Sequence, residues 1–242
     1  VDIATRQLDT LGYIRTPKVK FEVQHDSEGG VRMQSMINPL PVVDDWALLP
    51  DGSIAFVRGR DYHVDWVGRD GSKSSSAKIP FDWQRMTDED KSSFLDSLKA
   101  IRERQGANAP MPMGGAAPGG AAPQVMVFSQ TVTGGGGGGP ARTSTQAPRM
   151  VYVPASELPD YKPAFFAGST RADAEGNLWI RTIPTTAQAG GPVYDVIDRK
   201  GLLVERVQIP AGRTIAGFGR DGTVYLAHTD AGVTTLEKAS VR

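Results

Sequence analysis

Short apolar runs separated by glycine-containing turn signals are the feature that most constrains the fold of this chain. Asp51-Gly52, Asp70-Gly71 and Asp221-Gly222 each stand beside short runs rich in β-branched and aromatic residues. Such a pair between two apolar runs predicts a hairpin with a type I′ turn, because both central residues of that turn need positive φ. The chain is therefore expected to be all-β and built from antiparallel sheets.

The expected strands repeat with a long period. They cover residues 46–50, 54–57, 62–66, 178–183, 193–197, 202–209 and 223–227. Gly176 and Gly222 are 46 residues apart, and the interval holds about four strands. Four strands in roughly 40–50 residues is typical of one β-propeller blade. A sandwich or barrel does not explain the longer repeat, and βαβ units would need helices between the strands.

One amphipathic helix is predicted at residues 87–105. Thr87 can cap its first turn, with Asp90 in the capping-box position, and Gly106 ends it. Its apolar residues form one stripe, made of Phe94, Leu95, Leu98 and Ile101. We expect this helix to pack on the outside or the end of the sheets.

Residues 106–148 form a low-complexity insert within a single domain that spans residues 1–242. The insert holds 11 Gly and 6 Pro among 43 residues and one charged residue, Arg142. Such a composition buries too little side chain to offset its ordering entropy, so it predicts a loop that is flexible or ordered by a partner. Within it, residues 125–132 can form an edge strand. The expected partner contacts there are Val125, Met126, Val127, Phe128 and Val132.

Several strings together resemble a family of exported bacterial six-bladed β-propeller proteins. The strings are Trp46-x-x-x-Pro50-Asp51-Gly52, Tyr62-x-Val64-x-Trp66, Thr87-x-x-Asp90-Lys91, Leu158-Pro159-x-Tyr161-x-Pro163, Gly176-Asn177-Leu178-Trp179, Val193-Tyr194-Asp195-Val196-Ile197-Asp198 and Gly217-Phe218-Gly219-Arg220-Asp221-Gly222-x-Val224-Tyr225. The resemblance covers most of residues 40–240 outside the insert. It implies a propeller fold and a periplasmic location, and no particular reaction.

The chain departs from that family in length. A complete six-bladed ring needs roughly 250–300 residues of blade, and without the insert this chain supplies about 199. We therefore expect about four blades, some incomplete, with residues 8–15 and 18–24 as outer strands of a blade that begins upstream. The chain starts at Val1 and not Met, which fits export after removal of a leader.

Charge and cysteine content exclude several functional classes. The 27 Lys and Arg residues balance the 27 Asp and Glu residues, so no strong basic field favours nucleic acid or anionic lipid. The absence of cysteine excludes a disulfide scaffold, a thiolate nucleophile and a Cys-ligated metal. No apolar run approaches the length of a membrane span. The expected partners are proteins, without nucleic acid, and the chain is expected to be peripheral to a membrane.

Candidate catalytic and metal-binding residues are few. His63 with Asp65, and His228 with Asp230, repeat a His-x-Asp pattern that could supply metal ligands. We interpret both pairs as surface pairs and expect no metal and no cofactor. The glycine run at 134–139 lacks the following helix that a phosphate loop needs, and no serine has a Gly-x-Ser-x-Gly setting. The sequence therefore predicts a protein that is not an enzyme.

The tryptophans divide into two groups. Trp46, Trp66 and Trp179 lie in apolar strands and are expected in the core between sheets. Trp83 lies in an irregular stretch before the helix, where it either anchors that helix or is exposed for binding. It is the remaining interaction candidate.

The leading hypothesis is a non-catalytic scaffold or accessory subunit on the extracytoplasmic face of a larger membrane-associated complex, such as a respiratory or photosynthetic reaction-centre assembly. It is based on the lack of a catalytic constellation, the incomplete ring and the insert. Two alternatives stay open: a sensory propeller that binds a small molecule, glycan or peptide, and a metal-dependent propeller hydrolase.

Overall fold

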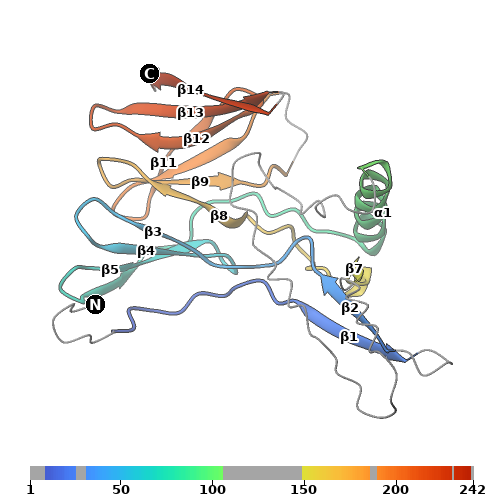
Figure 1. Cartoon of the computed structure of the whole chain (residues 1–242). Helices are drawn as coiled ribbons and strands as arrows, with labels where there is room; N and C mark the ends of the chain where they lie inside the picture. Colours follow the sequence, from blue (N-terminus) through green and yellow to red (C-terminus); the bar gives the residue numbers. More distant parts are fainter. Residues whose placement is uncertain (1–8, 26–30, 106–148, 186–189, 231, 241–242) are drawn as a thin grey trace, which may run out of the picture.

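A computed structural model describes residues 9–25, 31–105, 149–185, 190–230 and 232–240. Across these ranges the chain is mostly β-strand, arranged in several sheets, with one α-helix (Figure 1). Among the described strands, all pairings but one are antiparallel. The prediction of an all-β chain with one helix is confirmed at this level.

Three sheets follow one another along the chain, and in each of them strands adjacent in sequence are paired. The first sheet consists of β3 (Asp45–Leu48), β4 (Ile54–Arg58), β5 (His63–Val67) and β6 (Lys73–Ser75). The second sheet consists of β8 (Phe165–Ala172), β9 (Leu178–Thr182), β10 (Val193–Ile197) and β11 (Leu203–Gln208). The third sheet consists of β12 (Arg213–Phe218), β13 (Thr223–Asp230) and β14 (Val233–Ser240).

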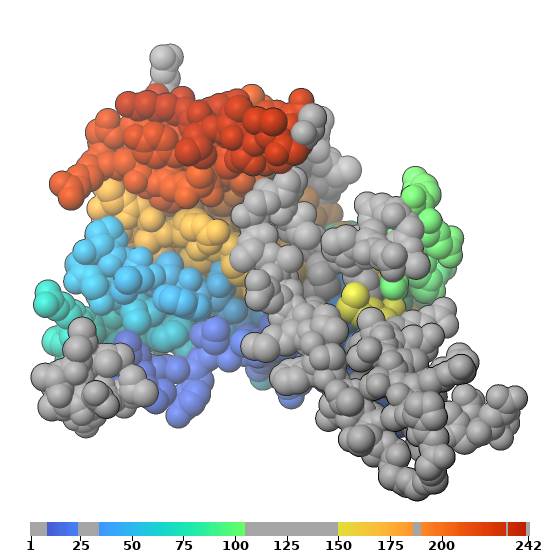
Figure 2. All heavy atoms as spheres, in the orientation of Figure 1, coloured from blue at the N-terminus to red at the C-terminus, as the bar shows by residue number. Residues whose placement is uncertain are grey.

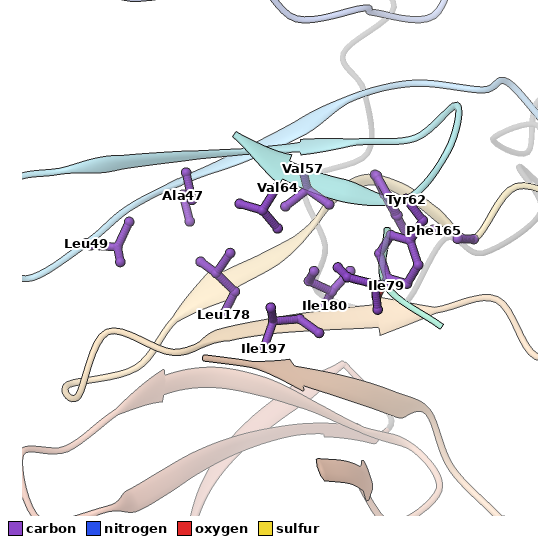
Figure 3. Packing of buried hydrophobic residues seen from close by; sticks show 12 residues of the cluster. Ala47, Leu49, Val57, Tyr62, Val64, Ile79, Phe165, Leu178, Ile180 and Ile197 are labelled. Atoms are coloured by element: carbon purple, nitrogen blue, oxygen red, sulfur yellow. The ribbon is translucent and has the colours of Figure 1, made fainter. Parts of the chain in front are cut away.

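These three sheets stack face to face in chain order, as the successive colour layers in Figure 2 show. The first core cluster fills the space between the first and second sheets (Figure 3) and includes Ala47, Leu49, Ala55, Val57, Tyr62, Val64, Ile79, Phe165, Leu178, Ile180 and Ile197. The second core cluster lies between the second and third sheets and includes Trp179, Tyr194, Val196, Ile209, Ile215, Val224 and Leu226. Alternate residues of each strand point to opposite faces, so the second sheet contributes to both clusters.

A fourth sheet extends away from the stack (Figure 1). It consists of β1 (Lys20–His25), β2 (Val31–Ile37) and β7 (Arg149–Tyr152), in the order β1-β2-β7. The β2–β7 pairing is parallel. Helix α1 (Asp88–Gln105) and the short 3-10 helix η1 (Ala155–Glu157) pack beside this sheet through a small cluster of Leu95, Val153 and Leu158.

The helix predicted at residues 87–105 is confirmed. The Thr87 Oγ1 atom accepts the Asp90 backbone N–H at 3.2 Å, and the Asp90 carboxylate accepts the Thr87 backbone N–H at 2.8 Å. This reciprocal capping box satisfies donors that a helix start leaves free. Leu95 and Leu98 of the predicted stripe are buried.

The turns are not of the type I′ form that the Asp-Gly pairs predict. In the first sheet the Leu49 N–H bonds to the Ser53 carbonyl, and the Gly52 N–H bonds back to the Leu49 carbonyl. Gly52 has φ of +83°, and Tyr62 is the only described non-glycine residue with positive φ. The loops are therefore type I turns followed by a glycine in the left-handed conformation. An Asp-Gly pair is compatible with this loop as well as with a type I′ turn. Further loops with this bonding pattern are 68–72, 173–177 and 198–202.

Two other expectations are wrong. Residues 9–15 belong to no strand and lie against the first sheet, where Arg58 donates to the Tyr13 carbonyl at 2.7 Å. The strand expected at 18–24 corresponds to β1, which begins at Lys20.

The second wrong expectation concerns Trp46, which was expected in the core. Trp46 is 51% exposed, because its side of β3 faces away from the second sheet. Trp179 is buried as expected, and Trp66 is half-buried against the first core cluster.

The left-handed turn glycines predict a stability difference within one hairpin. Gly222 has φ of +71° with nothing within 4 Å of an added Cβ, so Gly222→Ala adds only backbone strain. We expect it to lower the free energy of unfolding by about 1 kcal/mol. Gly217 has equally open surroundings without positive φ, so Gly217→Ala should be neutral or stabilising. Urea unfolding of both variants tests this, and equal losses would show that the turn conformation is not the cause.

Candidate functional site

An open cleft of about 590 Å³ lies beside Trp83, at the edge of the first sheet. Its volume is within the range of small-ligand sites. The lining residues come from five separate segments and are Arg15, Val42, Gly59, Arg60, Trp83, Pro159, Asp160, Tyr161 and Pro163.

Trp83 is held by a chain of aromatic rings that reaches into the first core cluster. Its ring meets Phe81 edge-on at 5.3 Å between centroids, and Phe81 meets Tyr62 edge-on at 5.6 Å. Tyr62 is fully buried and contacts Phe165 of β8 at 5.8 Å. Edge-to-face contacts of this kind fix ring orientation. The indole is therefore a preorganised wall of the cleft.

The segment that contributes Tyr161 to the cleft is attached by backbone hydrogen bonds. Arg85 and Tyr161 form an antiparallel bridge, flanked by bonds from Met86 N–H to the Asp160 carbonyl and from Lys162 N–H to the Gln84 carbonyl. This pairing holds Tyr161 at the surface, where its side chain is 48% exposed. The cleft thus presents two aromatic groups on two connected segments.

Gly59 allows the turn that carries Arg60 to lie close to the chain before β3. A Cβ atom at Gly59 would lie 1.9 Å from the Val43 carbonyl oxygen, a distance too short for any residue other than glycine. This close approach positions Arg60 on the rim of the cleft. Arg60 and Arg15 both have exposed side chains there.

The acidic residue of the cleft is held by a buried lysine. The Lys91 side chain is 5% exposed, and its Nζ donates to the Asp160 carboxylate at 2.7 Å. This hydrogen bond and the Lys91 charge lower the pKa of Asp160. Because the Asp160 carboxylate is already paired, the rim arginines give the cleft its capacity for an anionic group.

Behind the cleft, a buried carboxylate joins the first and second sheets. The Tyr62 hydroxyl donates to Asp195 Oδ2 at 3.0 Å, and Arg206 Nε donates to Oδ1 at 3.0 Å. Asp195 is 1% exposed, and burial raises its pKa despite both donors. Burial likewise raises the pKa of Tyr62 well above its ordinary value. Tyr62 holds this contact with φ of 48°, which is a strained conformation for a bulky residue.

The two His-x-Asp pairs have different surroundings. His63 Nε2 lies 3.3 Å from Asp65 Oδ1, and its Nδ1 lies 2.8 Å from Asp61. Burial opposes ionisation of Asp65, but hydrogen bonds from Ser75 and Arg58 outweigh it, so the pKa of Asp65 is lowered. His228 Nδ1 instead lies 3.0 Å from the Gly212 carbonyl. Within the described ranges, no group of three or more His, Asp or Glu residues is arranged to hold a metal.

The structure brings one of the predicted interaction residues into the cleft. Trp83 lines it, whereas Val125, Met126, Val127, Phe128 and Val132 lie outside the described residues. Tyr161 and Arg60 also line it, although the sequence predicts no role for either residue. The string Leu158-Pro159-x-Tyr161-x-Pro163 was the available signal for Tyr161. The position of Arg60 depends on the close approach at Gly59, which the local sequence does not show.

No family model, curated protein or solved structure matches this chain. None of the helices in the described part is long and apolar enough to cross a membrane.

The pKa shifts of two carboxyl groups, Asp195 and Asp51, predict opposite effects of pH on the free energy of unfolding. The folded pKa of Asp195 is raised above 3.8, so its contribution is present below pH 3.8 and is lost as pH rises through the folded pKa. Asp195→Asn has no carboxyl group to ionise, so the variant avoids that loss. Its free energy of unfolding relative to wild type should therefore increase as pH rises through the folded pKa of Asp195. The pKa of Asp51 is lowered to about 2 by hydrogen bonds from Ser53 and by Arg199, so its contribution is lost as pH falls from 3.8 to about 2.

Asp51→Asn should therefore lose stability relative to wild type as pH rises from about 2 to 3.8. Urea unfolding at a series of pH values measures both variants. Slopes of the same sign for the two variants would contradict the assigned environments.

Proposed function

We propose that this chain is a propeller-like, non-catalytic scaffold, an accessory subunit that docks on the periplasmic face of a larger membrane-associated protein complex. Sheet order supports the propeller interpretation, because each sheet keeps chain order and successive sheets stack. The first strands of neighbouring sheets, β3 and β8, are linked by the Thr170 N–H, which donates to Asp45 at 2.8 Å. The resemblance to exported propeller proteins supports the location, and a respiratory or photosynthetic reaction-centre assembly is a host class with the required extracytoplasmic face.

The observation that carries the scaffold proposal is an exposed apolar strip formed by β1, an edge strand of the fourth sheet, together with Val19, the residue directly before it. Val19, Phe21 and Val23 alternate along the chain and are 36%, 57% and 50% exposed. Alternate residues of a strand share a face. On the other face, Lys20 Nζ bonds to Glu157 Oε2 at 2.5 Å, which directs that face toward η1. The apolar strip therefore points away from the body of the protein.

The same strand offers backbone groups to a partner. In the described part of the chain β1 pairs only with β2, so its other edge is open. An edge strand with an exposed apolar face is a template for strand addition by another protein. The sheet extends away from the stack (Figure 1).

This proposal predicts the behaviour of the chain in native membranes. After gentle solubilisation and size separation, wild-type protein should migrate in a large assembly, and Val23→Asp should shift most of it to the free chain. Val204→Asp on edge strand β11 is a matched control, since Val204 is 57% exposed against 50% for Val23. A wild-type chain that migrates alone, or equal effects of both variants, would contradict docking through β1.

A second candidate function, ligand binding, is favoured by the cleft beside Trp83. Its two aromatic side chains, Trp83 and Tyr161, and its rim arginines, Arg15 and Arg60, suit an extended peptide that contains proline and an acidic residue. Proline rings stack on aromatic walls, and the extended conformation of such peptides needs little further ordering.

An acidic proline-rich hexapeptide and its lysine-containing counterpart test this alternative. Titration followed by tryptophan fluorescence should show binding of the acidic peptide only. Trp83→Ala should abolish that binding, and Arg60→Ala should weaken it roughly fivefold, as expected for an exposed ion pair of about 1 kcal/mol. Lys78→Ala removes an exposed cation outside the cleft and should have no effect. Equal binding of both peptides would exclude the role assigned to the arginines.

A further inference from the structure

The three stacked sheets repeat one pattern of residues after equivalent turns. The turns that precede β4, β9 and β13 share a backbone bond across their ends, from Leu49 to Ser53, from Asp173 to Asn177 and from Gly219 to Thr223. For the second and third sheets, we call the side that faces the sheet before it in the chain the preceding face, and the opposite side the following face. The following face of the first sheet is the side that faces the second sheet, and its preceding face is the opposite side. The equivalent pairs of residues on the preceding faces are Ile54 and Phe56, Leu178 and Ile180, and Val224 and Leu226.

The strand register extends this equivalence to the next strand. Phe56 is opposite Asp65, Ile180 is opposite Asp195, and Leu226 is opposite Glu237. Each of these three acids forms an ion pair with an arginine of its own sheet, and the pairs are Arg58–Asp65, Arg206–Asp195 and Arg213–Glu237. A hydrophobic residue opposite a paired acid is thus a shared feature of the three preceding faces.

Within the chain, two of these preceding faces are covered. Leu178 and Ile180 are fully buried by the first sheet, and Val224 and Leu226 are buried by the second. In each case the cover is the following face of the sheet before. The same type of sheet-to-sheet contact therefore occurs twice in the structure.

The preceding face of the first sheet is open along β3. Trp46 is 51% exposed and Leu48 is 60% exposed, while their register equivalents in β8, Thr170 and Ala172, are buried and half-buried. Residues 9–19 cover only part of this face, where Gly12 lies against the ring of Phe56. An apolar strip of a tryptophan and a leucine is left without cover by the described residues.

The following face of the third sheet is open in the same way. Tyr225 is 40% exposed, and its equivalents Ala55 and Trp179 are buried. Leu236 is 71% exposed, and its equivalents Val64 and Tyr194 are buried. The stack therefore ends on two different faces, each with apolar residues at positions that are buried in the other sheets.

We propose that these two faces bind each other between copies of this chain, so that the following face of the third sheet in one copy packs on the preceding face of the first sheet in the next. The occupant follows from the two contacts inside the chain, which pair these same two types of face. The residues at the centre of the new contact, Trp46, Leu48, Tyr225 and Leu236, are uncharged, so none of these four places a like charge in it. Because the two surfaces differ, the association is head-to-tail and leads to a closed ring or an open chain of copies.

A mixing experiment tests this head-to-tail contact. At about 100 μM, above the micromolar dissociation constants of weak interfaces, light scattering after size exclusion should give wild type a mass above the 25.9 kDa of one chain. Trp46→Asp disrupts the preceding face of the first sheet, and Leu236→Asp disrupts the following face of the third sheet. Each variant alone should therefore be a monomer. An equimolar mixture should form a dimer of one copy of each, because the mixture retains one intact pair of faces.

Controls separate this contact from other causes. Leu48→Lys is a second variant of the first face and should behave as Trp46→Asp does, while Val204→Asp on β11 should associate like wild type. Circular dichroism confirms folding of each variant. The proposal is overturned by a monomeric wild type, by a mixture that stays monomeric, or by Trp46→Asp that still dimerises alone. Association lost in Val23→Asp but kept in Trp46→Asp and Leu236→Asp would assign self-contact to β1 and overturn it as well.

Discussion

Face-to-face packing of successive sheets is the interaction on which the rest of this structure depends. Each of the three stacked sheets is short, and none has a hydrophobic interior of its own. The contact between the first and second sheets combines an apolar cluster with polar bonds, among them a buried one from Tyr62 to Asp195 and one from the Thr170 N–H to Asp45. Burial of the Asp195 carboxylate is costly unless it is hydrogen-bonded, so Tyr62 and Arg206 together make this sheet pairing specific. The strained backbone of Tyr62 is held in place by the same contact.

The repeated turns give each sheet the same orientation in the stack. A left-handed glycine ends the loop before each of β4 and β9, and the next residues then alternate between the two faces of the sheet. At equivalent positions of the third strand, each sheet carries an acid that is paired with an arginine of another strand of the same sheet. The open faces at the two ends of the stack are a consequence of this regularity, and the edge strand β1 is a separate surface. The proposed self-association and the proposed partner docking therefore depend on different residues.

Local signals in the sequence were sufficient to predict the strands beside turn glycines and the start of α1. Strand alternation at Trp46 was also evident, but the side of β3 that another sheet covers is a tertiary property, and the prediction of a buried Trp46 was wrong. The parallel pairing of β2 with β7 joins residues such as Ile37 and Tyr152, which no local pattern connects. Trp83 was identified because it stands outside a strand, whereas Arg60 reaches the cleft only through the contact of Gly59 with Val43.

The buried hydrogen bond from Tyr62 to Asp195 helps to join the first two sheets into one unit. A double-mutant cycle with Tyr62→Phe, Asp195→Asn and the double variant, followed by urea unfolding at pH 7, measures the coupling free energy of that bond directly. We expect each single variant to unfold in one transition and the coupling to be about 1–3 kcal/mol, as for buried hydrogen bonds to a charged group. A coupling near zero, or separate unfolding transitions for the two sheets in wild type, would contradict the account.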